Sequence, residues 1–149
     1  MDSERNKISM GVIITARKFS PQNRAGLLKP IVYCCPYEGV TEHAVSINLE
    51  LAQALKAFKP KRRTMQIERC FAETLLKLPE GVVLKDFDVL FNPDYKVDVM
   101  KMMVNTCKAK PFSIIWPGTF DGTRLVYAEE GFQDYKTYDV SAYDITCIV

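Results

Sequence analysis

Short apolar runs alternate with amphipathic stretches along this chain, which is typical of an α/β domain with a largely parallel sheet. The β-branched run ISMGVIIT at residues 8–15 predicts a first strand. The run at residues 31–35 lies between two prolines and predicts a short second strand. Apolar residues then recur every three or four positions, which predicts a helix that ends at Pro60 and a second one from about residue 64 to Pro79.

The second half of the chain predicts a buried strand at residues 81–91, followed by a helix whose N-cap is Asp94 or Asp98. The remaining predicted elements are a strand at 112–116, a turn at 117–122, a return strand at 125–128 and a closing strand near 145–149. The expected fold is therefore one α/β domain over residues 1–149, with three layers, a mostly parallel sheet and a C-terminal β-hairpin.

The composition changes this picture little but excludes several classes of protein. The chain has 149 residues, of which 48% are hydrophobic, as expected for one folded domain rather than a disordered chain. A single histidine excludes any site built on two or more histidines. Five cysteines without a CxxC pair fit a reducing compartment. No apolar run is long enough to span a membrane, and the first ten residues lack the apolar core of a secretory signal, so we expect a cytoplasmic protein.

Charge is distributed unevenly along the chain. Basic residues exceed acidic ones over residues 1–69, whereas acidic residues dominate residues 127–149. The basic side chains that are candidates for contact with phosphates or nucleic acid are Arg17, Lys18, Arg24, Lys61, Arg62 and Arg63. The alternative is that these side chains are simply solvated.

Sequence motifs for nucleotide binding and for nucleophilic catalysis are absent. The chain contains no GxxxxGK[ST], GxGxxG or GxSxG pattern and no Gly-Lys pair. His43 beside Cys34 or Cys35 would supply a base and a thiol, but nothing provides a third group. Buried structural cysteines are the alternative interpretation.

Three segments nevertheless suggest a family. They are SINLELAQAL at 46–55, GVVLKDFDVLFNPDYKVD at 81–98 and SIIWPGTFDGTRLVYAEEGFQDYKTYD at 113–139. The last is the most specific, with its ordered residues Trp116, Gly118, Tyr127, Ala128, Glu129, Gly131, Tyr135 and Tyr138. Together the segments resemble BrxF, the small P-loop protein of type 3 BREX phage-defence systems. The resemblance implies a P-loop-NTPase-like core, a possible role for ATP and magnesium, and larger protein subunits as partners.

The chain departs from that family at both nucleotide motifs. After the first strand, where the resemblance implies a phosphate-binding loop, Gly26 and Lys29 are the nearest remnants. At the Walker B strand, Lys85 occupies the position of the metal-binding aspartate, and Asp86 and Asp88 follow as candidate metal ligands. An ammonium group there would repel the metal ion. We therefore expect ATP hydrolysis to be lost.

The acidic C-terminal segment alternates carboxylates with aromatic residues, which are enriched at protein interfaces. Tyr135 and Tyr138 are the candidate partner contacts, and the alternative is that they pack on the sheet. The expected function is an accessory subunit of a BREX-type defence complex that acts as a docking platform and is not an enzyme. The alternatives are an active small ATPase that uses residues 20–29 with Asp86 or Asp88, and a nucleic-acid-binding module that uses the basic first half.

Overall fold

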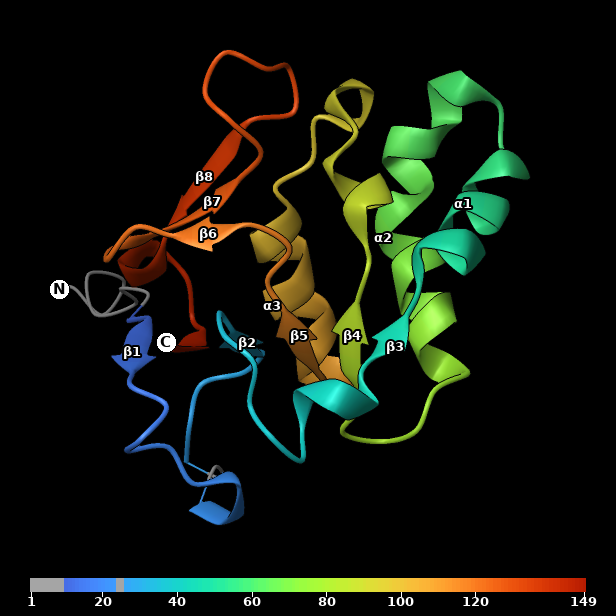
Figure 1. The fold of residues 1–149 in the computed structure, drawn as a ribbon. Helices are drawn as coiled ribbons and strands as arrows, with labels where there is room; N and C mark the ends of the chain where they lie inside the picture. The colour runs from blue at the N-terminus through green and yellow to red at the C-terminus, as the bar shows by residue number, and fades with distance from the viewer. Residues whose placement is uncertain (1–9, 24–25) are drawn as a thin grey trace, which may run out of the picture.

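A computed structural model describes residues 10–23 and 26–149 of the protein. Its centre is a six-stranded sheet in the order β1-β9-β2-β5-β4-β3, in which every strand pairing is parallel (Figure 1). The strands are β1 (Val12–Ile14), β2 (Ile31–Tyr33), β3 (Val45–Ser46), β4 (Val83–Lys85), β5 (Ser113–Ile115) and β9 (Thr146–Ile148). The mixed α/β class with a mostly parallel sheet, which the alternating pattern predicts, is thus confirmed.

The closing strand β9 takes a place that its position in the chain does not indicate. It inserts between β1 and β2, so that Cys147 lies opposite both Ile13 and Val32. Strand β1 is left at the edge of the sheet, where Val12 and Ile13 are each 42% exposed. The centre of the sheet is therefore β2 and β5, whose residues Val32 and Ile114 are fully buried.

Three α-helices pack on this sheet: α1 (Asn48–Lys56), α2 (Pro60–Leu76) and α3 (Val99–Ala109). The first helix ends at Lys56, four residues before the predicted end at Pro60. The second begins at Pro60 rather than near residue 64, because a proline in the first turn costs no hydrogen bond. Asp98 is the N-cap of α3 and accepts a hydrogen bond from the backbone N–H of Lys101 at 3.0 Å. Within the described residues, none of these helices combines the length and apolarity needed to cross a membrane.

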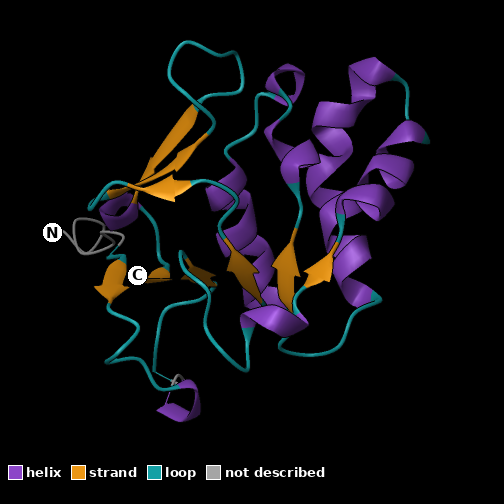
Figure 2. Cartoon of the chain, viewed as in Figure 1, coloured by secondary structure: helices purple, strands orange, loops and turns teal. Residues whose placement is uncertain are grey.

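The two faces of the sheet are covered differently. Residues Val32, Leu84 and Cys147 share one buried cluster with all three helices, which lie together in Figure 2. The residues that alternate with them along the strands, such as Tyr33 and Ile148, form a second cluster whose other described members come from neighbouring strands and from loops, with no α-helical residue among them. The expectation of three layers is therefore wrong for the described chain: helices form one layer, and the second face carries loops. The β2–β3 connection is too short for a crossover helix.

The predicted strand at residues 81–91 is the clearest local error. Strand β4 ends at Lys85, Asp86 takes a positive φ of 51°, and a 3₁₀ turn forms at Asp88–Phe91. Phe87 is fully buried and Leu90 is 1% exposed. A turn, and not a strand, therefore buries these apolar side chains. A continuous apolar run does not distinguish the two, because it has no period of its own.

The predicted hairpin forms part of a second, antiparallel sheet, in which its return strand pairs with residues 119–120 and not with the strand at 113–115. This sheet has three strands, β6 (Thr119–Phe120), β7 (Arg124–Tyr127) and β8 (Lys136–Asp139). Aromatic rings join it to the main core: Phe91 stacks on Tyr127 at 3.9 Å between centroids, and Trp116 meets Tyr138 edge-on at 5.8 Å. The small sheet is therefore packed into the core through its aromatic face.

Candidate functional site

The carboxyl ends of β2, β5 and β4 meet at one edge of the main sheet and border a cavity of about 370 Å³ that is open to solvent. Its walls are formed by Tyr33, Cys34, Cys35, Ile115 and Trp116, with Lys85, Thr41 and Glu42 among the polar residues that line it. Ligands of open α/β sheets bind at this edge, because the loops that follow parallel strands converge there. We therefore treat this carboxyl-edge cavity as the candidate site.

Two half-exposed thiols line the carboxyl-edge cavity. A side-chain hydrogen bond from Cys147 lowers the pKa of Cys34, although burial acts in the opposite direction. The same bond, together with burial, raises the pKa of Cys147. Of these two thiols, Cys34 is therefore the more easily ionised, and it is half-exposed, whereas Cys147 is buried.

The loop at residues 34–44 borders the cavity and connects β2 to β3. The backbone N–H of Tyr37 donates to the Thr41 hydroxyl at 2.9 Å, and the Tyr37 hydroxyl donates to the carbonyl of Phe19 at 3.0 Å. The backbone N–H of Gly39 donates to the Glu42 carboxylate. A 3₁₀ turn at Thr41–His43 is the only helical structure in this connection. Hydrogen bonds within the loop therefore hold its conformation, and no α-helix begins between residues 34 and 44.

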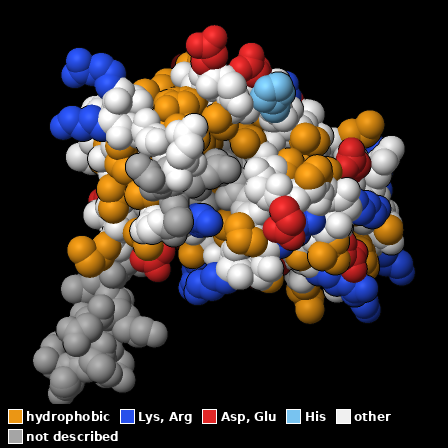
Figure 3. All heavy atoms as spheres, turned by 90° about the horizontal axis from the view of Figure 1, so that it is seen from below, with side chains coloured by type: hydrophobic (Ala, Val, Ile, Leu, Met, Phe, Trp, Pro, Cys, Tyr) orange, Lys and Arg blue, Asp and Glu red, His pale blue; other side chains and the backbone are white. Residues whose placement is uncertain are grey.

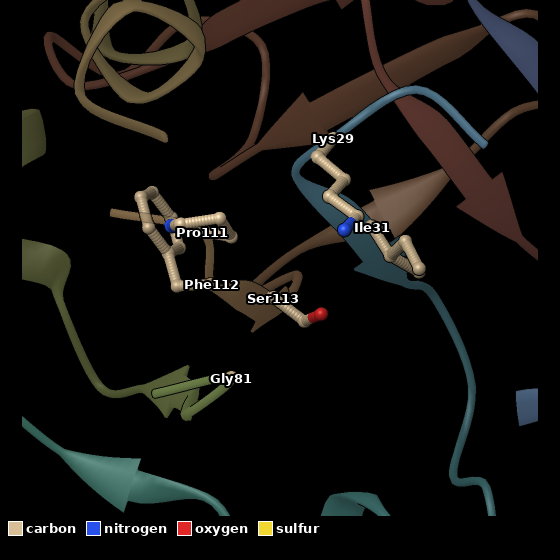
Figure 4. A pocket seen from close by; sticks show the side chains of 6 residues that line it. All are labelled: Lys29, Ile31, Gly81, Pro111, Phe112 and Ser113. Atoms are coloured by element: carbon tan, nitrogen blue, oxygen red, sulfur yellow. The ribbon is translucent and has the colours of Figure 1, made fainter. Parts of the chain in front are cut away.

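Lys29 and Gly26 lie away from this site. Lys29 precedes β2 and lines a small cavity of about 60 Å³ with Gly81 and Ser113, at the amino ends of the strands (Figure 4). Gly26 is exposed, and a Cβ placed on it would meet nothing within 4 Å. Because Asp86 follows the carboxyl end of β4, the sheet separates the predicted phosphate-binding residues from the predicted metal ligands. These two groups do not form one site.

Asp86 and Asp88 are each held by a hydroxyl group from a different element. The Ser46 hydroxyl donates to Asp86 at 2.5 Å, and the Tyr127 hydroxyl donates to Asp88 at 2.8 Å. Burial is the main cause that raises the pKa of Tyr127, and the bond to Asp88 adds to it. Among the residues described, no group of three or more His, Cys, Asp or Glu side chains is placed to hold a metal ion.

The candidate basic residues do not form one patch. Arg17 and Lys18 are exposed beyond β1, far from the N-terminus of α2 that carries Lys61 and Arg62 (Figure 1). Arg24 lies outside the described residues. Figure 3 shows basic and acidic side chains interspersed over one face of the molecule.

Arg63 has a structural role. Its Nε donates to the carbonyl of Leu55 at 3.1 Å and to that of Phe58 at 3.0 Å, at the end of α1. A cation at a helix C-terminus satisfies free carbonyls and complements the helix dipole. Arg63, which lies in α2, therefore links that helix by hydrogen bonds to the C-terminal end of α1.

Of the two candidate tyrosines for partner contact, Tyr138 is 4% exposed and packs against Trp116, so its assignment to a partner surface is wrong. Tyr135 is half-buried in the β7–β8 loop. Phe132, another aromatic residue of the acidic C-terminal segment, is not one of these two candidates; it lies in the same loop and is 65% exposed. Its neighbour Gly131 has a positive φ of 98°, which is common at a turn.

No protein family, curated protein or solved structure matches this chain. The fold and the site therefore define its class: a mixed α/β protein with a six-stranded parallel sheet, a smaller antiparallel sheet and a cavity at the carboxyl edge of the larger one.

Proposed function

We propose that this protein is a non-hydrolysing accessory subunit of a BREX-type antiviral defence complex, with a P-loop-NTPase-like sheet that serves as a docking platform. The role in defence rests on the resemblance to BrxF. The observation that carries the loss of hydrolysis is the β2–β3 connection, residues 34–44. It follows a central strand at the carboxyl edge, and it contains one glycine and no lysine.

The chemistry of triphosphate binding supports the same conclusion. A phosphate cradle needs several backbone N–H groups at a helix N-terminus, a lysine for the terminal phosphates and a hydroxyl for magnesium. Here the N–H groups of Tyr37 and Gly39 already bond to Thr41 and Glu42. Glu42 also brings negative charge to the place where phosphate would lie.

The docking surface that we propose is the β7–β8 loop, residues 128–135, which extends beyond the end of the small sheet in Figure 1. Phe132 is exposed near its tip, and the exposed carboxylates of Glu129 and Glu130 lie beside it in the chain. An exposed aromatic ring with flanking acids fits a partner that offers an apolar pocket with a basic rim.

Co-purification with the larger proteins encoded by neighbouring genes tests this function. The double substitution Phe132→Ala with Tyr135→Ala should weaken the association about 30-fold or more, because truncation of even one such interface aromatic costs about 2 kcal/mol. Leu49→Ala is the matched control, since Leu49 is 70% exposed on α1, a different element. Full retention of the partner by the double variant, or equal loss by the control, would overturn the proposed surface.

A further inference from the structure

The carboxyl-edge cavity plays no part in the proposed docking surface, and its size suits a small ligand. Its volume of about 370 Å³ falls within the range of cavities that hold small organic ligands, about 300–1,000 Å³. We propose that it binds a small aromatic molecule that carries one anionic group, recognised by Lys85, and an N–H donor that faces Glu42. This inference is independent of the proposed docking function.

The walls of the cavity suit a flat apolar body. Ile115 contributes an aliphatic side chain and Pro36 an exposed apolar ring, whereas Trp116 is 5% exposed and Tyr33, whose ring packs against Phe19 and Tyr37, is fully buried behind them. The indole is held in place because its Nε1 donates to the carbonyl of Val126 at 3.1 Å. Trp116 also meets Phe91 edge-on at 5.8 Å. The wall is thus rigid before any ligand arrives, and a preformed wall reduces the entropy cost of binding.

The polar residues at the cavity offer one charge of each sign. Over residues 10–23 and 26–149, the Lys85 ammonium has no hydrogen-bond or ion-pair partner. Its neighbour Asp86 bonds to Ser46 instead. The carboxylate of Glu42 accepts one bond, from the N–H of Gly39, and keeps further acceptor positions. A ligand with one anionic group and one donor therefore complements this edge.

A triphosphate does not fit these requirements. A single lysine would face three or four negative charges, and the carboxylate of Glu42 would repel them. The geometry points to a ligand with a single negative charge, in which most of the binding free energy comes from apolar contact and Lys85 sets the orientation.

The probe 1-anilinonaphthalene-8-sulfonate has these features, since it combines aromatic rings with a sulfonate and an N–H group. Titration of the full-length protein, followed by probe fluorescence, should show one saturable site. Lys85→Gln removes the charge from an exposed side chain and should weaken binding about tenfold, as for a charge-assisted hydrogen bond. Lys56→Gln, an exposed lysine on α1, is the matched control and should bind as the wild type does. Equal affinity in both variants would overturn the proposal.

A second measurement locates the probe on the unmodified protein. Cys34 and Cys35 line the cavity, whereas Cys70 and Cys107 are buried elsewhere. Saturating probe should slow alkylation of Cys34 and Cys35 by iodoacetamide about tenfold or more, as measured by mass spectrometry of peptides. The same concentration of probe should protect the Lys85→Gln variant much less. Unchanged alkylation in the wild type at saturation would place the probe elsewhere and overturn the proposal.

Discussion

At the scale of single residues, Gly118 explains why the segment after β5 has its particular sequence. A Cβ at this position would lie 1.9 Å from the carbonyl oxygen of Val126. The same carbonyl accepts the hydrogen bond from the indole of Trp116. The absence of a side chain at Gly118 therefore lets the small sheet approach the main core and fixes the indole that lines the cavity.

Gly118→Ala should lower the free energy of unfolding by about 3 kcal/mol, because the backbone of β7 must move and the Trp116 bond is then strained or broken. Urea denaturation followed by Trp116 fluorescence measures this, since the chain has one tryptophan. Gly26→Ala is the control: a Cβ there meets nothing within 4 Å, so stability should change by less than about 0.5 kcal/mol. Equal effects of the two substitutions would contradict the close approach.

At the scale of elements, the turn between β6 and β7 depends on one carboxylate. Asp121 accepts hydrogen bonds from the backbone N–H groups of Thr123 at 3.0 Å and Arg124 at 2.7 Å. The guanidinium of Arg124 donates a further bond at 2.9 Å. The backbone bonds, followed by the Arg124 side chain, lower the pKa of Asp121 to about 2.

This lowered pKa predicts how the turn responds to acid. Because the folded-state pKa is below the ordinary value of about 3.9, the stabilisation is fully present above that value and is lost as the pH falls through about 2. Arg124→Gln should raise the pKa of Asp121 only part of the way, since the backbone donors remain. Carboxyl NMR titration of both proteins measures this. A return to the ordinary pKa in the variant would show that the side chain, not the backbone, dominates.

At the scale of the whole molecule, the loops at the carboxyl edge of the main sheet lack the lysine and the free backbone N–H groups that hold a triphosphate. Lys29 lies at the opposite edge from Asp86, and the loop after β2 is closed by its own hydrogen bonds. The thermal unfolding midpoint should therefore stay within about 1 °C on addition of millimolar ATP with magnesium. A nucleotide present at 100 times its Kd would stabilise the protein by about 2.7 kcal/mol, which for this chain length corresponds to several degrees. A magnesium-dependent shift of that size, or release of phosphate, would restore the ATPase alternative.

Local patterns predict much of this fold. The helical period and Pro60 locate the boundary between α1 and α2, and Asp98 is one of the two expected N-caps. Strand β3 has only two residues, Val45 and Ser46, which is too short to leave a period in the sequence. Strand β8 was missed as well, because its residues carry charges and hydroxyls on the exposed side.

The candidate site was less predictable than the elements. Tyr138 and Tyr135 look alike in the sequence, and only the packing against Trp116 distinguishes the buried ring from the accessible one. Arg63 likewise belongs to a run of basic residues, but its contact with the end of α1 depends on how two helices cross.

Residue order alone establishes which segments alternate between strand and helix, and it establishes that no Gly-Lys phosphate loop exists anywhere in the chain. These properties depend on side chains a few positions apart, so a short window contains them. The insertion of β9 between β1 and β2, and the cavity that joins Glu42, Lys85 and Trp116, come from pairings between distant segments. Such pairings form because whole faces of strands and helices are buried against one another, and no pattern within a short stretch of sequence specifies them.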